Sequence, residues 1–405
     1  MRKHIAVFLC IFSLHIAAFT QAHAAPAPPK IAAASAILVD AVTGDVLYEK
    51  ACRKRRPPAS TTKMMTAILA LENGKLDQSV CASPYASRTP FGSLNLKPGE
   101  QLSLNDVMYA MLLRSANDGA VCIAENVAGS EKKFVELMNK KAKEIGTKQT
   151  HFANPHGLQN KYHYSTAYDL ALIARYAVGI PEFNEMVRTK KIRIERSINT
   201  LDVTLKNTAN FLWKFDGADG IKTGYTRQAG HCFVGSATRD GWRLIAVVLK
   251  SKSAGEDTAA LMNYGFKYFQ GVVFVRKNDV VVPKVPVAGG VVEHVDLVAA
   301  GNLAKTLPRS AQAVPKIETE LDHVSAPIKK GEKLGTLTGY LNGEKIGTVD
   351  LVAAESIDRT VAATIWLLVR SVLTVSGIVL VGFVTYGTAV AKTARRRRRG
   401  FKKRS

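Results

Sequence analysis

Residues 57–68 read PPASTTKMMTAI, a proline-led entry into an apolar helix. Ser60 stands at the start of that helix, so its backbone N–H lies at the positive helix end, where it can stabilise an oxyanion. Lys63 follows three residues later and therefore shares a helical face with Ser60. A serine hydroxyl needs a base to become a nucleophile, and a lysine serves as that base when burial or a second cation lowers its pKa. The segment predicts the Ser/Lys pair of a hydrolase that works through a covalent intermediate.

Two further short motifs follow in order, Ser115-Ala116-Asn117 and Lys222-Thr223-Gly224. Lys222 supplies the second cation, and together with the Thr223 hydroxyl it can bind a substrate carboxylate. Ser115 and Asn117 are expected in a loop that enters a helix, where Ser115 relays a proton and Asn117 holds the substrate amide. Each motif is weak alone, and their order and local context carry the prediction.

These motifs and the runs around them resemble the low-molecular-mass penicillin-binding proteins, the serine-type D-alanyl-D-alanine carboxypeptidases. The matching runs are scattered from about residue 36 to residue 249 and are specific as a set. They are Pro58 to Ala67, Leu113 to Asp118, Asn154 to Leu158, His163 to Asp169, Asp219 to Thr226 and Ala229 to Phe233. The resemblance implies a catalytic domain of the serine β-lactamase/D,D-peptidase type.

The resemblance also implies roles for particular residues. Ser60 is the acylated nucleophile, Lys63 the base, Ser115 the proton shuttle and Lys222 the carboxylate-binding residue. The oxyanion hole is formed by the backbone N–H groups of Ser60 and Tyr225. No cofactor is implied, and no metal site is expected because the chain has no H-E-x-x-H pattern. Three histidines at positions 151, 156 and 163 are expected to serve loop packing instead.

The expected substrate is the peptidoglycan pentapeptide stem, from which the enzyme removes the terminal D-alanine, and β-lactam antibiotics are expected to acylate Ser60 as substrate mimics. A D,D-endopeptidase acting on peptidoglycan cross-links is the nearest alternative, because its catalytic residues would be identical. A β-lactamase is a weaker alternative, since Ala116 stands where penicillin-hydrolysing class A enzymes carry Asp. A catalytically silent wall-binding scaffold is the alternative from a different class.

The pattern of the first 250 residues predicts an α+β domain whose terminal segments pair in one antiparallel sheet. Alternating apolar residues and turn residues indicate strands, and longer apolar periodicity indicates helices. The strands are expected at 36–40, 46–48, 220–224, 230–237 and 244–249. The helices are expected at 61–72, 105–113, 120–128, 131–145 and 166–177.

The remainder of the chain divides by composition. We expect a catalytic domain at 25–271 and a small all-β domain at 272–357, where short valine-rich runs such as 280–282, 291–292 and 347–351 alternate with turn residues. A signal peptide is expected at 1–24, because a basic start precedes an apolar run and an Ala-His-Ala cleavage site.

A membrane anchor is expected at the other end, with an interfacial segment and transmembrane helix within 358–391. Residues 371–391 carry no charge, which gives a helix of about 31 Å, long enough to cross a bilayer. A basic tail at 392–405 carries nine positive charges, which should keep it in the cytoplasm and leave the body outside. Membrane lipid is therefore an expected partner. Nucleic acid is not, because much of the formal net charge of +23 lies in this tail.

Cysteine usage excludes a metal ribbon and a thioredoxin-like site, because no C-x-x-C pair exists. Four cysteines follow the predicted signal peptide. Cys122 and Cys232 lie in apolar helix and strand contexts and are expected to be buried free thiols. A Cys52–Cys81 disulfide is the less favoured alternative to free thiols at those positions.

Overall fold

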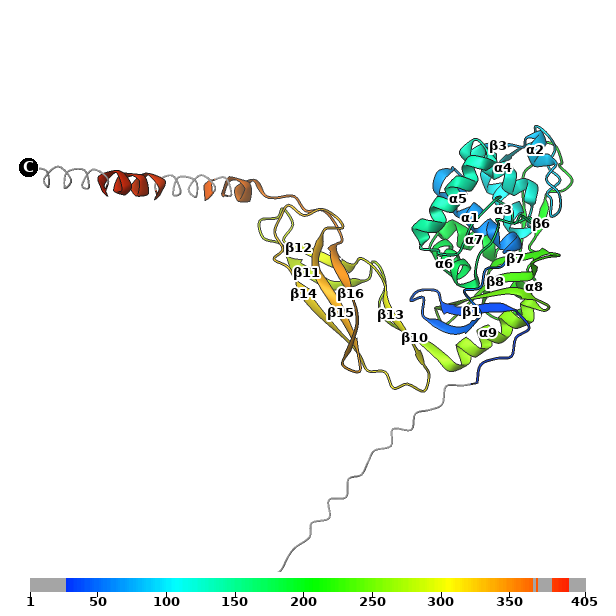
Figure 1. Ribbon diagram of the computed structural model, residues 1–405. Helices are drawn as coiled ribbons and strands as arrows, with labels where there is room; N and C mark the ends of the chain where they lie inside the picture. The colour runs from blue at the N-terminus through cyan, green and yellow to red at the C-terminus, as the bar shows by residue number, and fades with distance from the viewer. Residues whose placement is uncertain (1–26, 367–368, 371–380, 393–405) are drawn as a thin grey trace, which may run out of the picture.

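The protein is described from a computed structural model that places residues 27–366, 369–370 and 381–392 (Figure 1). The expected signal peptide lies outside the described residues, and so do half of the expected membrane span and nearly all of the basic tail. Within the described ranges, no helix is both long and apolar enough to cross a membrane.

A five-stranded antiparallel sheet forms the centre of the first domain, with strand order β2-β1-β9-β8-β7. The strands are β1 (Ser35–Asp40), β2 (Val46–Lys50), β7 (Ala218–Thr226), β8 (Gly230–Arg239) and β9 (Trp242–Ser251). The first strand of the chain pairs with the last one of the domain, in the register Leu38 with Ala246. The expected pairing of the terminal segments is therefore confirmed. Among the residues that the structure describes, β7 pairs with β8 alone and so forms one edge of this sheet.

Helices cover both faces of the sheet. A large helical layer packs on one face around Met64, Val107 and Phe134. It contains α1 (Lys63–Asn73), α3 (Leu104–Leu113), α4 (Asn117–Ala128), α5 (Glu131–Ile145), α6 (Ala167–Ala177) and α7 (Pro181–Arg188). Five of these helices were expected from the sequence, with ends that agree within three residues and, for α5, with both ends as expected.

The opposite face of the sheet is covered by α9 (Ala254–Tyr268), which was not predicted from the sequence. Its two glycines disfavour a helix, yet its buried residues recur at helical spacing (Thr258, Leu261, Met262, Gly265 and Phe266). Gly265 is required by close packing, because a Cβ there would lie 2.5 Å from Leu244 Cδ1. The smaller elements are α2 (Pro84–Ser87), α8 (Asn210–Lys214), β3 (Ser79–Cys81), β4 (Gln101–Ser103), β5 (Lys191–Arg193) and β6 (Thr204–Lys206).

A second, all-β domain follows α9, as expected. Its sheet has the strand order β11-β12-β16-β15-β14 around a core that includes Leu297, Leu337 and Leu351. Those strands are β11 (Val280–Pro286), β12 (His294–Ala299), β14 (Pro315–Leu321), β15 (Lys333–Leu341) and β16 (Glu344–Ala353). The valine-rich run at 291–292 does not form a strand, because these valines are exposed in bends that follow Gly289 and Gly290.

A separate two-stranded ribbon, β10 (Phe269–Val275) with β13 (Leu303–Pro308), leads from α9 into the second domain (Figure 1). It contacts the first domain directly, since the Lys305 ammonium lies 3.1 Å from Asp45 and the Thr306 hydroxyl donates to Asp40 at 2.8 Å. The two domains are thus joined by polar contacts as well as by the chain.

All four cysteines of the described chain are free thiols. Cys122 and Cys232 are buried, as expected, and burial raises the pKa of the Cys122 thiol to about 12. Cys52 is buried beside the Glu49 carboxylate, whereas Cys81 is exposed.

Candidate active site

Ser60 lies in a short 3₁₀ turn, Ala59–Thr62, that leads directly into α1. Ala59 has a left-handed backbone with φ near 49°, which turns the chain sharply before the serine. Two hydroxyls close the turn: Thr61 donates to Pro58 O at 2.7 Å and Thr62 donates to Ala59 O at 2.8 Å. Ser60 itself is half-buried and faces a cavity. The turn therefore holds a serine hydroxyl and its backbone N–H at a fixed position.

Lys63 is fully buried and points its amine at Ser60. Its Nζ lies 3.0 Å from Ser60 Oγ, 2.6 Å from Asn117 Oδ1 and 2.7 Å from the carbonyl oxygen of His156. All three neighbours can accept a hydrogen bond, and none carries a negative charge. The amine is thus oriented without an ion pair.

A loop from Ala153 to His163 supports this turn from beneath. Gly157 packs so closely against it that a Cβ would lie 1.9 Å from the Ala59 carbonyl oxygen. His163 accepts from Ala153 N–H at Nδ1, so its Nε2 carries the proton and donates to Thr62 Oγ1 at 2.8 Å. Burial lowers the pKa of the His163 ring to about 3 and keeps it neutral. From the sequence this histidine was expected to serve loop packing, and its contact with the turn Ala59–Thr62 was not predicted.

Ser115 and Asn117 lie where α3 ends and α4 begins. Ser115 has a left-handed backbone with φ near 64°, and it lines the same cavity as Ser60. The Asn117 amide donates to the carbonyl oxygens of Pro90 and Phe91 at 2.9 and 2.6 Å, while its oxygen faces Lys63. Both ends of the Asn117 side chain are therefore engaged within the chain, and the amide joins Lys63 to the loop that contains Phe91.

Strand β7 brings the third motif to the opposite wall of the cavity. Lys222 is buried, and Thr223 is half-buried on the cavity side. Gly224 packs against the turn Ala59–Thr62, since a Cβ at Gly224 would lie 2.8 Å from Ser60 N. Tyr225 follows as an exposed residue whose ring lies tilted against that of His231, with 4.6 Å between the ring centroids. Because Gly224 lies so close to Ser60 N, the backbone that leads into Tyr225 lies beside the Ser60 N–H.

Burial sets the protonation of the two lysines. The pKa of Lys63 is well below its usual range, first because the amine is desolvated and second because the positive charge of Lys222 lies nearby. Desolvation lowers the pKa of Lys222 to about 7. Both amines therefore hold a proton less tightly than an exposed lysine does, and the charge of Lys222 opposes protonation of Lys63.

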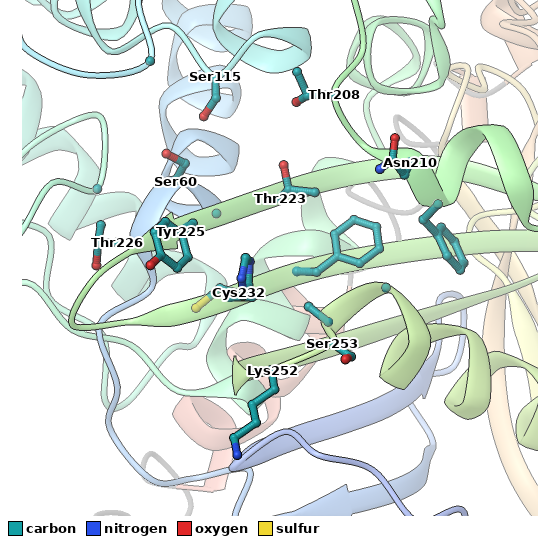
Figure 2. A pocket seen from close by; sticks show the side chains of 18 of the residues that line it. Ser60, Ser115, Thr208, Asn210, Thr223, Tyr225, Thr226, Cys232, Lys252 and Ser253 are labelled. Carbon is teal, nitrogen blue, oxygen red and sulfur yellow. The ribbon is translucent and has the colours of Figure 1, made fainter.

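The cavity that these elements enclose has a volume of about 870 Å³. Figure 2 shows Ser60, Ser115 and Thr223 around one part of it, each contributed by a different element. No group of three or more metal-ligating side chains exists among the residues that the structure places. The geometry thus places a serine hydroxyl beside a buried lysine amine, with a second buried lysine on β7.

Two family models match the chain: "D-alanyl-D-alanine carboxypeptidase" over residues 21–253 and "Penicillin-binding protein 5, C-terminal domain" over residues 269–359. The chain is 33% identical to the D-alanyl-D-alanine carboxypeptidase DacF of Bacillus subtilis, over 81% of this chain and 86% of that protein. It is 32% identical to DacC of Escherichia coli, over 82% of this chain and 86% of the relative. Among solved structures, penicillin-binding protein 5 from Haemophilus influenzae is similar, with a TM-score of 0.64 at 30% identity, over 82% of this chain and 99% of that chain.

Proposed function

Because this chain belongs to the D-alanyl-D-alanine carboxypeptidase family, we propose that it removes the terminal D-alanine from peptidoglycan stem peptides through an acyl-enzyme on Ser60. The observation that carries the proposal is the 3.0 Å separation between Ser60 Oγ and the buried amine of Lys63. A neutral amine at that distance can accept the hydroxyl proton as the oxygen attacks the carbonyl carbon.

The proposed reaction has two halves. In the first, Ser60 Oγ bonds to the carbonyl carbon and Lys63 takes the serine proton. That proton passes through Ser115 to the amide nitrogen as the C–N bond breaks, so D-alanine leaves as an amine and Lys63 is neutral again. In the second, water attacks the ester carbon, Lys63 takes a proton from the water, and it returns this proton to Ser60 Oγ as the acyl C–O bond breaks. The N–H groups of Ser60 and Tyr225 stabilise the oxyanion in both halves.

We propose that the substrate binds to β7 and to the facing side of the cavity, where α3 ends and α4 begins. Lys222 and the Thr223 hydroxyl bind the terminal carboxylate of the peptide. Asn117 holds Lys63 in place and contacts the substrate amide after releasing one of its hydrogen bonds to Pro90 or Phe91. β-Lactams acylate Ser60 by the same route, because a strained cyclic amide presents the same carbonyl to the nucleophile.

The decisive experiment is product analysis with the purified full chain and a pentapeptide that ends in D-Ala-D-Ala. We expect stoichiometric release of free D-alanine, and none from the Ser60→Ala variant. A cross-linked peptide dimer, incubated in parallel, separates carboxypeptidase from endopeptidase activity. If D-alanine is released equally by wild type and Ser60→Ala, the proposed nucleophile is wrong.

We also propose the location of the enzyme, on the sequence of its ends. The proposal retains a signal peptide at 1–24, a catalytic domain at 25–271, a β-domain at 272–357 and a basic tail at 392–405. The uncharged segment 371–391 supports a single membrane crossing, and the nine basic charges that follow support a cytoplasmic tail. The catalytic domain would then act outside the cytoplasmic membrane, where peptidoglycan lies.

A further inference from the structure

The short ribbon of β5 and β6 carries cations on its solvent-facing side. Among the described residues the two strands pair only with each other, in the register Lys191 with Lys206 and Ile192 with Leu205. Leu205 is buried and Ile192 is half-buried, so this second pair points into the domain. Side chains alternate along a strand, and Lys191, Arg193 and Lys206 therefore share the opposite side, where all three are exposed.

The register of the ribbon places two like charges directly opposite each other. Paired residues of an antiparallel ribbon have Cβ atoms about 4.5–5.5 Å apart, and like charges at such a pair destabilise it. Lys191 and Lys206 form this pair, and Arg193 adds a third cation on the same side. An anion bound between these groups would replace repulsion by attraction. The ribbon therefore favours a ligand that carries negative charge.

Trp213 of α8 extends this cationic surface. Its ring centroid lies 5.2 Å from Lys206 Nζ and 5.5 Å from Lys190 Nζ, within the range of a cation–π interaction. The indole is oriented because its N–H donates to the Asn207 carbonyl oxygen at 3.2 Å, and Trp213 remains 42% exposed. We call this surface the basic ribbon patch and define it by Lys190, Lys191, Arg193, Lys206 and Trp213.

The acidic residues nearby in the chain do not neutralise the basic ribbon patch. Asp202, which precedes β6, pairs with Arg114 at 2.8 Å, and Asp216, which follows α8, pairs with Arg239 at 3.4 Å. Glu195, which follows β5, is exposed and is not paired with the patch. Within the part of the chain that the structure describes, none of the four cations of the patch forms an ion pair with a carboxylate. Their charges are therefore free to bind an external anion.

The basic ribbon patch adjoins the active-site cavity. Thr208 and Asn210 line the cavity and follow β6 closely in the chain, and Asn210 begins the helix that contains Trp213 (Figure 2). Figure 1 places β6 and α8 on the side of the first domain that is away from the second domain. Since the second domain leads to the proposed membrane crossing, this position disfavours a lipid surface as the ligand. It favours a polymer that can reach the patch and the cavity together.

We propose that the basic ribbon patch binds polymeric peptidoglycan through the carboxylates of stem peptides next to the one that is cleaved. The inference rests on the proposed function for the identity of the polymer, and it adds a binding surface outside the cavity. Stem peptides with free carboxylates recur along a glycan strand, so the cations of the patch bind neighbouring stems while one stem occupies the cavity. The exposed part of Trp213 contacts the sugars. Contacts made by one strand at several points raise the concentration of its stems at Ser60.

The test measures binding to a polymer that offers the active site no D-Ala-D-Ala end. The full chain in detergent is sedimented with insoluble peptidoglycan whose stems have been trimmed to tetrapeptides. In the variant Lys191→Gln/Arg193→Gln/Lys206→Gln we expect the apparent Kd to rise about tenfold, because exposed charge contacts are weak singly and here act together. The Tm of this variant should not fall, since removing like charges relieves repulsion in the ribbon.

A matched variant and a modified polymer serve as controls. Lys132→Gln/Lys133→Gln/Lys143→Gln removes three exposed cations from α5, which lies across the first domain from β6 (Figure 1). It makes the same change in net charge and should bind peptidoglycan as wild type does. Conversion of the carboxylates of the polymer to amides should weaken wild-type binding to the level of the ribbon variant.

The inference is overturned if the ribbon variant binds peptidoglycan as tightly as wild type, or if the amidated polymer binds as tightly as the native one. It is also overturned if the ribbon variant loses binding to vesicles of anionic phospholipid and keeps binding to peptidoglycan, because the patch would then be a lipid contact. Release of D-alanine from a soluble pentapeptide tests the proposed function separately, and with that release intact the proposed function survives the loss of this inference. Absence of release from wild type would refute the proposed function and, with it, the assignment of the bound polymer as substrate.

Discussion

Replacing Lys63 with methionine removes the amine and keeps the length and bulk of the side chain. The base that we assign to Ser60 is thereby deleted, since the amine nitrogen lies 3.0 Å from the serine oxygen. Loss of a general base slows catalysis by about 100-fold to 10,000-fold, which corresponds to about 3–5 kcal/mol of activation free energy. We expect acylation by penicillin to slow by at least 100-fold in Lys63→Met.

The experiment must distinguish a loss of folding stability in Lys63→Met from the loss of the base. The variant also leaves Asn117 Oδ1 and the His156 carbonyl oxygen without the amine that contacts them at 2.6 and 2.7 Å. A buried acceptor that loses its partner costs about 1–3 kcal/mol of folding free energy. Thr66→Val is the matched control, because the Thr66 hydroxyl donates to the adjacent Pro155 carbonyl oxygen and does not contact Ser60. It removes a buried hydrogen bond from the same loop and keeps the base.

The assay is the second-order rate constant of labelling by fluorescent penicillin at pH 7.5, measured together with thermal unfolding. We expect Thr66→Val to label within threefold of wild type even when its Tm falls. If Lys63→Met retains a tenth or more of the wild-type rate, another group accepts the serine proton. If both variants lose labelling in proportion to their loss of Tm, the effect of Lys63→Met is structural.

Four further outcomes are expected. Ser60→Ala should abolish covalent labelling by fluorescent penicillin, and a labelled band of normal intensity would exclude Ser60 as the nucleophile. A plot of kcat/KM against pH should fall above about pH 7, because Lys222 then loses the charge that binds the substrate carboxylate. In Lys222→Arg this fall at high pH should disappear, because the guanidinium stays protonated. His163 has a pKa near 6.5 in the unfolded chain and about 3 in the folded chain, so the free energy of unfolding should drop as the pH falls from about 6.5 to about 3. Urea titrations of His163→Gln should show a pH dependence that is smaller by about 1.4 kcal/mol per pH unit within this range. Deletion from residue 371 onward should release an active protein outside the cytoplasm, and retention of the shortened chain in the membrane fraction would show that another segment anchors it.

Much of the fold could be predicted because its signals are local. The hairpin of β1 and β2, helices α3 to α6 and strands β8 and β9 each carry their own periodicity and turn residues. Helix α9 was missed because its two glycines weaken the local signal. The stability of that helix comes from packing against Leu38 and Leu244, which are distant in the sequence.

The candidate site divides in the same way. The proximity of Ser60 and Lys63 follows from their spacing on one helical turn, and the structure places them 3.0 Å apart. Lys63 contacts Asn117 across 54 residues of sequence and the His156 carbonyl oxygen across 93. Contacts between residues so far apart in the sequence cannot be predicted from local residue spacing. The same holds for His163, whose ring reaches Thr62 across 101 residues.

The hydrogen bonds of Asp118 explain how the buried Lys63 can act as a base. The negative charge of Asp118 raises the pKa of Lys63 and would restore the ammonium if its oxygens contacted the amine. Instead the carboxylate is used by the loop beyond Gly92: it accepts from Ser93 Oγ at 2.6 Å and from the N–H groups of Leu94 and Leu96 at 3.0 and 3.1 Å. These donors stabilise the anion away from Lys63, which is left with neutral acceptors only. The same loop is thus held by Asn117 at Pro90 and Phe91 and by Asp118 at residues 93–96. A substitution that removes the hydrogen bonds donated to Asp118 should let its carboxylate raise the pKa of Lys63 further, and so weaken Lys63 as a base without changing any residue that contacts the amine.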